Sequence, residues 1–421
     1  MEEERDDPSV QAEPSTELPD NRGVMTDLIL LVGSNPLPNY LSACALRPSR
    51  VALVYTDETR EAKDQLRRRL ECALGKGVTF EEPFVEDATC ATTVRRVLDS
   101  LLSDYGDRNV LLNYTGGTKV MAAHARLAFC SSKGRWEDAS YLDEGDVHHE
   151  ARLRFDDGNS KPLSYYREIP LKLGTVLALH GITHRPRAPR DPAPTTDDAR
   201  EILCKVLADP SLARALHCER ERLQGFRNPN NARSEPFQAN RHGLTLSLPE
   251  FPTSEQLAQL ENANERKSWY RQWYAFIGGG WLEEWLGAQI QELDLASAQE
   301  ITVGVNAYRG KKKAQLEVDV VVVRGHRSYF VSCTTDTSKH LCKSKLFEVA
   351  VRSRQLGGDL ARAALVCLAD DSTVSALQTD VDDVWGASNT TRVFGLSDVR
   401  AWSDCEGKQP NRYSLKAWME S

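Results

Sequence analysis

The sequence lacks the patterns that define several common classes of protein. It has no run of about 18 apolar residues, the length that a membrane-spanning helix needs, so no membrane partner is expected. None of its ten cysteines forms a CxxC pair, which argues against a structural zinc site. The GxxxxGK[ST] spacing of a Walker P-loop and the GxGxxG dinucleotide motif are both absent. The net charge of −8 argues against a surface coated with positive charge.

The amino terminus also lacks the marks of a secretion signal. Residues 1–24 are acidic and proline-rich, which predicts a disordered tail. Without a signal peptide, we expect a cytoplasmic protein in a reducing environment, where thiols stay unpaired. Several cysteines lie in apolar, periodic segments, and we expect them to be small core residues.

What the sequence does contain is a regular alternation of strands and helices. Short continuous apolar runs are typical of buried parallel strands, and amphipathic segments separate them. This order predicts an α/β domain with a mainly parallel sheet, followed by a hairpin within residues 137–170. The predicted strands cover 28–32, 51–55, 78–85 and 110–113, and the predicted helices 38–46, 58–74, 89–104 and 120–129.

Composition divides the chain into segments. The first domain is expected over 25–183. Residues 184–198 are proline-rich and polar, which predicts a linker. A connector of uncertain fold follows over 199–253. A second α/β domain is expected over 254–421, in the order helix, three strands, helix, strand.

Two loops of the first domain have the composition of an anion site. Residues 115–119 (TGGTK) lie between a predicted strand and a helix, where glycines let backbone N–H groups face outward and the helix dipole favours phosphate. The loop 33–36 (GSNP) follows the first strand. In open α/β sheets ligands bind beyond the carboxyl ends of strands, so both loops are expected to line one crevice. The alternative is a plain structural turn.

The segments VGSNPLPNYL (32–41) and NYTGGTKVMAAHA (113–125) resemble the CARF family, the CRISPR-associated Rossmann fold. The resemblance implies binding of a cyclic oligoadenylate across a homodimer interface. A ligand with its own two-fold symmetry suits such a dimer, and relatives of this architecture imply cyclic tetra-adenylate. It also implies that the messenger is contacted by Gly33, Ser34, Asn35, Thr115, Gly116, Gly117, Thr118 and Lys119.

The second domain has two carboxylates on an apolar strand, 316–323. Strand alternation predicts that Glu317 and Asp319 share one face with Val321 and Val323. Buried carboxylates are costly unless they are compensated, and a divalent cation is a suitable compensator. The alternative is a strand end with both acids solvated.

The order of elements around this strand resembles the PD-(D/E)XK nuclease family, and the segments GGGWLEEWL, EVDVVVV and KLFEVAVRSRQLGGDLARAALV resemble CRISPR nucleases that fuse this restriction-endonuclease-like α/β fold to CARF. The resemblance implies a Mg²⁺ or Mn²⁺ ion held by Asp319 and the helix residue Glu283, which activates water for phosphodiester hydrolysis. The sequence departs from the family pattern at two positions. Ser332 stands where an acid is expected, and Thr334 where a lysine is expected.

Three hypotheses follow from this departure. In the first, Asp319 and Glu283 bind metal with the Cys333 backbone carbonyl, and Lys343 or Lys345 replaces the missing lysine. The chain is then a messenger-activated endonuclease acting on DNA, RNA or both. In the second, the domain binds nucleic acid without cutting it. In the third, the protein degrades the cyclic messenger.

A basic run precedes the strand that carries the carboxylates. Lys311, Lys312 and Lys313 lie in a predicted turn that leads into this strand. Lysines beside a phosphodiesterase site can hold the substrate backbone, so we expect all three to contact phosphates of the nucleic acid. The alternative is a solvated loop.

Overall fold

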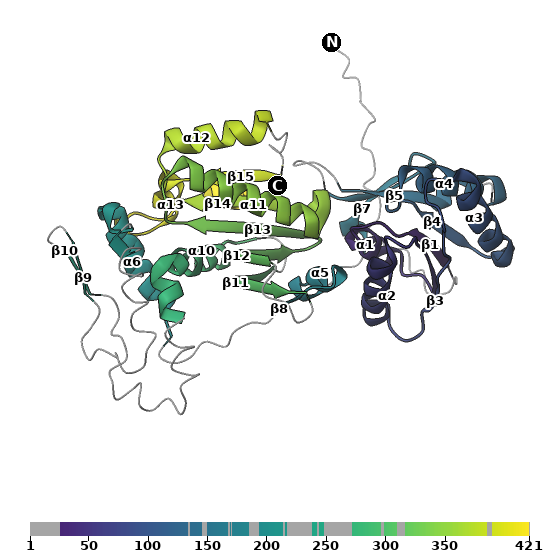
Figure 1. Cartoon of the computed structure of the whole chain (residues 1–421), viewed down its shortest axis with the longest axis horizontal. Helices are drawn as coiled ribbons and strands as arrows, with labels where there is room; N and C mark the ends of the chain where they lie inside the picture. Colours follow the sequence, from purple (N-terminus) through teal and green to yellow (C-terminus); the bar gives the residue numbers. More distant parts are fainter. Residues whose placement is uncertain are drawn as a thin grey trace, which may run out of the picture.

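The computed structural model contains two α/β domains side by side (Figure 1). No helix in the ranges that it describes is both long and apolar enough to cross a bilayer. The predicted tail and most of the predicted helix from 254 lie outside these ranges. The structure describes residues 26–133, 135–144, 150–166, 169, 171–184, 193–213, 215–216, 238–241, 244–247, 272–295, 299–309, 316–384 and 390–420.

The first domain is built on a seven-stranded sheet in the order β3-β2-β1-β4-β5-β6-β7. The first five strands are parallel, and β5, β6 and β7 form the antiparallel hairpins expected at the end of this domain. All five residues of β1 are buried, as its continuous apolar run predicts. The strands are β1 (Asp27–Leu31), β2 (Arg50–Val54), β3 (Thr79–Glu81), β4 (Val110–Asn113), β5 (Ala139–Asp143), β6 (Arg152–Phe155) and β7 (Ser160–Pro162).

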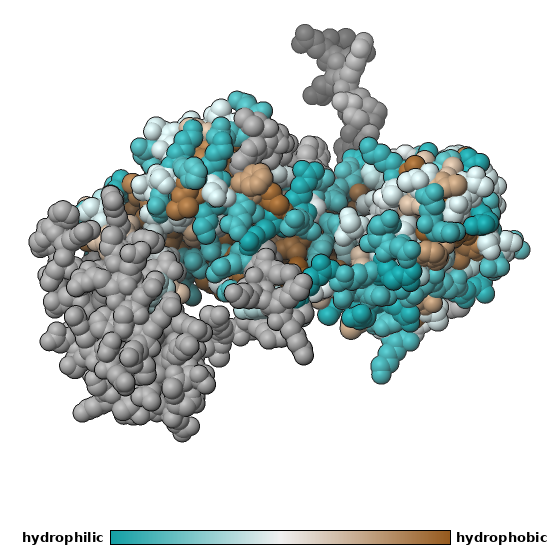
Figure 2. All heavy atoms as spheres, viewed as in Figure 1, coloured by the Kyte–Doolittle hydropathy of each residue, from teal (hydrophilic) through white to brown (hydrophobic). Residues whose placement is uncertain are grey.

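Helices connect the parallel strands and cover the sheet. α2 buries Leu66 and Leu70 and turns its many charged side chains to solvent, so its region of the surface is largely hydrophilic in Figure 2. By contrast, nine of the ten residues of α1 are buried. These helices are α1 (Leu37–Leu46), α2 (Arg60–Leu74), α3 (Ala91–Tyr105) and α4 (Lys119–Lys133), with 3₁₀ turns at Trp136–Asp138 and Leu163–Tyr165.

The second domain is built on a six-stranded sheet in the order β15-β14-β13-β12-β11-β8. β11, β12 and β13 are antiparallel neighbours, whereas β13, β14 and β15 run parallel. The strands are β8 (Thr183–His184), β11 (Gln299–Tyr308), β12 (Leu316–Arg324), β13 (Arg327–Thr334), β14 (Arg362–Cys367) and β15 (Thr391–Phe394), beside a separate hairpin of β9 (Gln238–Arg241) and β10 (Leu244–Ser247).

Helices lie on both faces of this sheet. α6, α10, α13 and α14 contribute to a core with Val320 and Val322. α11 packs on the other face with Val321 and Phe330, and this core continues into the first domain through α1 and α5. The helices are α5 (Leu173–Leu179), α6 (Thr196–Ala208), α10 (Trp281–Gln291), α11 (Lys339–Gly357), α12 (Asp371–Thr379), α13 (Leu396–Trp402) and α14 (Tyr413–Glu420), with further turns at Phe276–Gly280, Gly358–Leu360 and Asp380–Val384.

The domain boundary differs from the predicted one. β8, at the end of the predicted first domain, pairs with β11 of the second sheet. α6 begins inside the predicted linker and continues into the predicted connector, yet it packs in the second core through Ile202 and Leu203. The apolar face of α6 decides which core it joins, and proline content does not report this.

Most of the described cysteines are unpaired, and two form a disulfide. Cys44, Cys130, Cys333, Cys342 and Cys367 are free and buried, as expected for small core residues. Cys204 and Cys405 instead form a disulfide across 201 residues of sequence. The expectation of unpaired thiols is therefore wrong for this pair, because the packing of α6 against the loop after α13 brings the two sulfur atoms together, and this proximity is not visible in the sequence.

The predicted alternation of β12 is broken at Asp319. Val318 packs in the same core as Val321 and Val323, although strict alternation places it with Val320 and Val322. In the antiparallel register, Gly304 of β11 lies opposite this break and has a φ of 65°. A left-handed residue disrupts the ladder and re-aims the side chains beside it, so Asp319 stands where the sheet changes face.

Candidate functional sites

The first site lies where the order of the parallel strands reverses. β1 and β4 are adjacent, and their connections run to opposite sides of the sheet. Such a reversal leaves a crevice beyond the carboxyl ends of the two strands, the usual ligand site of open α/β sheets. The loops 33–36 and 115–118 follow these strand ends directly. The structure thus places the two loops that carry the residues predicted to contact the messenger at the same edge of the sheet, where Gly33 touches Gly116 and Gly117.

Glycine is required where the two loops touch. A Cβ atom on Gly116 would overlap the Leu31 carbonyl oxygen and lie 2.9 Å from the Gly33 nitrogen. Gly117 has a φ of 76°, which side chains rarely adopt. The backbones of the two loops therefore pack directly against each other, and this close packing requires glycine at both 116 and 117.

Hydroxyl groups hold the second loop to its surroundings. The Thr115 hydroxyl donates to Asn113 Oδ1 at 2.8 Å and accepts from the Leu142 N–H at 2.6 Å, which ties the end of β4 to β5. The Thr118 hydroxyl accepts from the Met121 N–H at 3.1 Å and caps α4. Lys119, the first residue of α4, is exposed at the helix end that favours anions.

Asn39 is a residue of this site that the sequence analysis did not identify. Its amide donates to the Leu31 carbonyl at 3.0 Å, and its Oδ1 lies 2.9 Å from the position of a Cβ on Gly116. The side chain is fully buried, and its Oδ1 has no hydrogen-bond partner among the described residues. The signal was an asparagine inside the apolar helix segment LPNYLSACAL, because a buried amide requires a polar neighbour.

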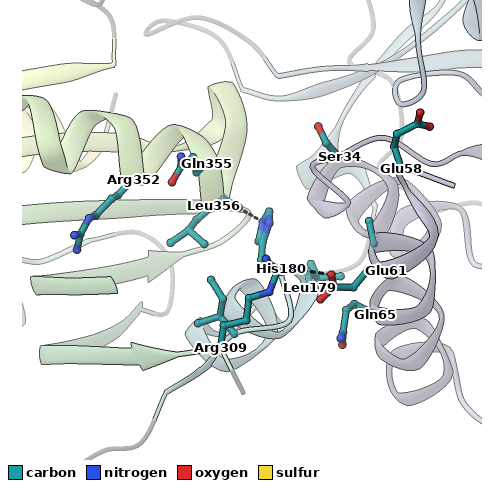
Figure 3. Close-up of a pocket in the computed structure, with 12 residues that line it drawn as sticks. Ser34, Glu58, Glu61, Gln65, Leu179, His180, Arg309, Arg352, Gln355 and Leu356 are labelled. Carbon is teal, nitrogen blue, oxygen red and sulfur yellow. Dashed lines mark hydrogen bonds and ion pairs between the residues drawn. The ribbon is translucent and has the colours of Figure 1, made fainter. Parts of the chain in front are cut away.

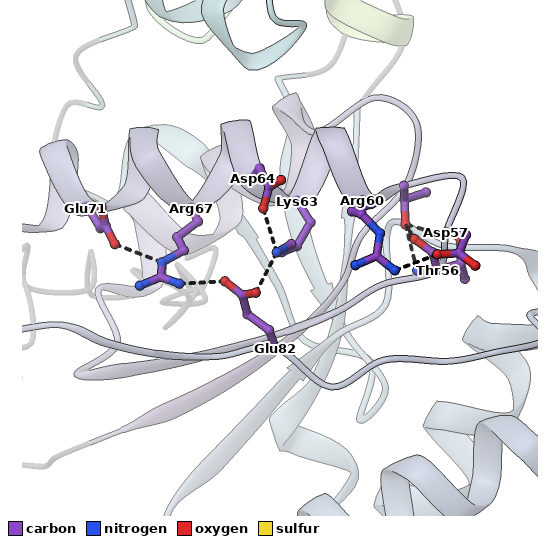
Figure 4. Close-up of polar contacts among 9 residues, drawn as sticks. Thr56, Asp57, Arg60, Lys63, Asp64, Arg67, Glu71 and Glu82 are labelled. Atoms are coloured by element: carbon purple, nitrogen blue, oxygen red, sulfur yellow. Dashed lines mark hydrogen bonds and ion pairs between the residues drawn. The ribbon is translucent and has the colours of Figure 1, made fainter.

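An ion-pair network holds α2 beside this crevice (Figure 4). The ammonium of Lys63, which is only 5% exposed, contacts Asp64 at 2.6 Å and Glu82 at 2.5 Å. Arg67 joins Glu82 to Glu71 at 2.7 and 2.9 Å. Glu82 follows β3, so the network fixes α2 against the edge of the sheet.

The second site centres on two acidic side chains from different elements. Glu283 lies in the first turn of α10, and Asp319 lies at the break in β12. Burial first, and then the charges of Asp319 and Glu284, raise the pKa of Glu283 well above its usual range. Burial likewise raises the pKa of Asp319. The two carboxyl groups are close enough to repel each other when both are ionised.

Asp319 is held by the neighbouring strand. Its Oδ2 accepts from the Ser332 hydroxyl at 2.9 Å and from the Cys333 N–H at 2.6 Å. These donors favour the ionised carboxylate and partly offset the effect of burial on its pKa. Burial also raises the pKa of the Cys333 thiol, so its sulfur stays protonated and unsuited to metal binding. Thr334 instead accepts a hydrogen bond from the Asp336 N–H at 3.2 Å.

The structure distinguishes the two lysines of α11. The charge of Lys345 lowers the pKa of both Glu283 and Asp319, so its ammonium lies within range of an electrostatic interaction with both carboxyl groups. Lys343 instead pairs with Asp380 at 2.9 Å on the exposed side of the helix. The sequence left both lysines as candidates. Helix geometry separates them, because residues two apart point about 200° from each other.

The three lysines predicted to contact nucleic acid belong to a segment on which the structure gives no information. Lys311, Lys312 and Lys313 lie outside the described residues, in the gap between 309 and 316. The described chain ends at Arg309 after β11 and resumes at Leu316, the first residue of β12. Their role as phosphate contacts therefore stays a prediction from the sequence.

The second site fits a divalent cation of the Mg²⁺ type. Within the described ranges, no group of three or more His, Cys, Asp or Glu side chains is placed to hold a metal. Mg²⁺ usually needs only one or two carboxylates, with water and substrate phosphates completing its shell. Glu283 and Asp319 provide such a pair, and a cation would favour the ionised form of both carboxyl groups, which burial disfavours.

Comparisons with known proteins agree with this geometry. Residues 271–401 match the family model of the Card1-like endonuclease domain. The chain resembles the solved structure of Can2 from Sulfobacillus thermosulfidooxidans in complex with cyclic tetra-adenylate, with 19% identity, a TM-score of 0.58, and coverage of 87% of this chain and 95% of that chain. It also resembles the protein VC1899 from Vibrio cholerae, with 13% identity, a TM-score of 0.65, and coverage of 94% and 98%. No curated protein sequence matches the chain.

The fold and the second site thus define the class. The chain combines a Rossmann-like α/β domain with a second, mixed α/β domain, its whole-chain fold is similar to that of Can2, and residues 271–401 match the Card1-like endonuclease domain. The resemblance to CRISPR ancillary nucleases inferred from the sequence motifs is confirmed. From here on, the unit built on the seven-stranded sheet is called the sensor domain and the unit built on the six-stranded sheet the effector domain, after the functions proposed below.

Proposed function

We propose that the protein is a cyclic-oligoadenylate-activated, metal-dependent endonuclease of type III CRISPR defence, acting in the cytoplasm on DNA, RNA or both. The observation that carries the proposal is the convergence of Glu283, Asp319 and Lys345 within the segment that matches the Card1-like endonuclease domain. Two acids can hold a divalent cation and a lysine can stabilise charge on a phosphate, so the three groups suit metal-dependent phosphodiester hydrolysis.

In the proposed effector site, Asp319 and Glu283 hold a Mg²⁺ or Mn²⁺ ion, with the Cys333 carbonyl as a further oxygen ligand. When bound, the cation supplies Lewis acidity toward the phosphate and lowers the pKa of water. Ser332 and the Cys333 N–H orient Asp319 through Oδ2 and leave its other oxygen for the cation. Lys345 stabilises the negative charge that develops on the phosphate.

The proposed substrate contacts extend beyond this centre. Lys311, Lys312 and Lys313 come shortly before β12, the strand that carries Asp319, so they are suited by position in the sequence to hold phosphates on either side of the scissile bond. All three lie outside the described residues.

In the proposed sensor site, cyclic tetra-adenylate binds at the loops 33–35 and 115–119 of two chains in a homodimer. The fold of the Can2 complex with cyclic tetra-adenylate supports this ligand. Closure of the dimer around the messenger would bring two effector domains together on one nucleic acid, because the messenger favours the closed pair.

The proposal is tested by plasmid nicking and single-stranded RNA cleavage with Mn²⁺, with and without cyclic tetra-adenylate. We expect cleavage only with the messenger, and its loss in Asp319→Ala. Asp371→Ala is the matched control, because Asp371 is an exposed acid at the start of α12. Messenger binding without cleavage would instead identify a non-cutting binder, and loss of the messenger without nicking would identify a ring-opening enzyme.

A further inference from the structure

A half-buried carboxyl group of the sensor domain, that of Glu144, meets the effector domain at the end of α11. Glu144 follows β5 directly, and its Oε2 accepts from the Leu360 N–H at 2.9 Å. Leu360 belongs to the 3₁₀ turn that continues α11. Burial, and then the charge of Asp359, raise the pKa of Glu144 to about 7. Removing a carboxyl group from water costs free energy, and here the group makes a hydrogen bond between the two domains.

The same turn touches the predicted messenger loop. Gly358 has a φ of 61°, and a Cβ placed on it would lie 2.7 Å from Asn35 Nδ2 and 3.1 Å from Glu144 Oε2. Asn35 also accepts from the Leu37 N–H at 3.1 Å, which fixes it at the start of α1. One residue of the first loop therefore packs directly on the end of the effector helix.

A hollow lies between the domains next to this junction (Figure 3). This pocket of about 380 Å³ is lined by Ser34 on the sensor side and by Arg352 and Gln355 of α11 on the effector side. His180 spans it and contacts the Leu356 carbonyl at 2.8 Å. The last turn of α11 therefore borders open volume on one side and the Glu144 contact on the other, which leaves it room to shift.

The opposite half of α11 carries Lys345 into the effector site. The helix runs without interruption from Lys339 to Gly357. At about 1.5 Å per residue, the 12 residues from Lys345 to Gly357 span ~18 Å. An unbroken helix moves as a unit, so a displacement of its final turn also displaces Lys345 relative to Glu283 and Asp319.

We propose that Glu144 is a positioning residue for the effector site. Together with Asn35, Glu144 fixes the position of the end of α11, and the position of α11 in turn fixes that of Lys345. Because Asn35 is a predicted messenger contact, messenger binding then acts on Lys345 within the same chain, in addition to any closure of the dimer. This link to the messenger rests on the proposed function, whereas the link between Glu144 and Lys345 does not.

The test uses the full chain and hydrogen–deuterium exchange of α11, read separately at residues 339–347 and 355–361. We expect Glu144→Ala to increase exchange in both segments, and Glu144→Gln, which keeps a hydrogen-bond acceptor, to restore it. Asp143→Asn is the matched control, because Asp143 pairs with the surface residue Arg154. A change confined to 355–361 in Glu144→Ala overturns the proposal.

A second variant covers the case in which Glu144→Ala fails to fold. Gly358→Ala pushes a methyl group against Asn35 and Glu144, whereas Gly407→Ala has a similar φ of 69° and nothing within 4 Å. Both variants carry a similar backbone strain, so they differ only in the contact of the added methyl group with Asn35 and Glu144. We therefore expect Gly358→Ala, and not Gly407→Ala, to change exchange at 339–347. Equal behaviour of the two variants contradicts the proposal.

Activity separates this inference from the proposed function. With cyclic tetra-adenylate, we expect Glu144→Ala to lower the maximum cleavage rate roughly tenfold while the messenger Kd changes less than about twofold, within the range of typical coupling between sites. Absence of messenger binding and cleavage in the wild type would refute the proposed function alone, because the exchange experiments still decide the role of Glu144. An unchanged rate in a cutting enzyme would refute the inference alone.

Discussion

Ser332 donates its hydroxyl proton to Asp319 across the β12–β13 pair, with 2.9 Å between the two oxygen atoms. Ser332 occupies the position where the nuclease pattern has a second acid. In the proposed site, a hydrogen-bond donor that orients Asp319 thus takes the place of a second acid. The Cys333 N–H donates to the same Oδ2, so one oxygen of Asp319 is held by two donors.

This arrangement predicts a specific cost for Ser332→Ala. A hydrogen bond to a charged group is worth about 1.5–3 kcal/mol, so we expect the cleavage rate to fall by roughly 10- to 100-fold. Ser328→Ala is the matched control, since Ser328 is buried in the same strand and its hydroxyl has no partner among the described residues. Equal rates for the two variants, measured with saturating messenger and Mn²⁺, would contradict the role of Ser332.

The two lysines of α11 provide an internal comparison. We expect Lys345→Ala to lower the cleavage rate by at least about 100-fold, because a charge that stabilises the transition state is typically worth several kcal/mol. Lys343→Ala should change the rate less than about threefold, because an exposed ion pair such as Lys343–Asp380 contributes little. Single-turnover cleavage by both variants measures this difference, and a reversed order would show that the sequence-based alternative, Lys343, is the functional lysine.

The close contact between the two loops of the sensor domain predicts that a substitution at Gly116 weakens messenger binding. Gly116→Ala should force the loops 33–36 and 115–118 apart, because its methyl group has no room beside the Leu31 carbonyl oxygen. We expect the affinity for cyclic tetra-adenylate to fall at least roughly tenfold, since backbone donors must stay aligned to bind phosphate. Gly77→Ala adds a methyl group in open space and serves as the control. Calorimetric titration that gives the same Kd for both variants would place the messenger elsewhere.

Glu144 predicts a pH dependence of stability. Its pKa is raised to about 7 in the folded chain, so the folded state binds more protons than the unfolded state between about pH 4.5 and 7. Its contribution is therefore present at acidic pH and is lost as pH rises through 7. The groups that face it are Asp359, Arg354, the Leu360 N–H and the Asn35 amide.

Glu144→Gln is permanently neutral and should lack this dependence. We expect the difference in Tm between Glu144→Gln and wild type to be larger at pH 8 than at pH 5, as measured by calorimetry. The same difference at both pH values would contradict the raised pKa, because it would mean that folding does not change the protonation of Glu144 in this range. Asp143→Asn, examined in parallel, should show no such change between the two pH values.

The sequence alone determined the order of elements and the first site. Continuous apolar runs such as that of β1 can only be buried in a sheet covered on both faces, which made the α/β class predictable. Glycines directly after parallel strands reflect local backbone requirements, and the carboxyl ends of such strands lie at one edge of the sheet. The sequence therefore correctly predicted that the loops 33–36 and 115–119 are neighbours. Asp319 was recognisable because an acid within an apolar strand needs compensation, whereas Glu283 was expected only from the resemblance to the nuclease family.

Only the tertiary structure decided how distant residues meet. The choice of Lys345 over Lys343 depends on the rotation of α11 over the sheet, which no local pattern specifies. The break at Asp319 depends on the left-handed Gly304 in the neighbouring strand, and the Cys204–Cys405 bond depends on α6 joining the effector core. The contact between Glu144 and Leu360 spans 216 residues. Contacts of this kind arise from packing between surfaces, and local sequence carries no information on which surfaces will face each other.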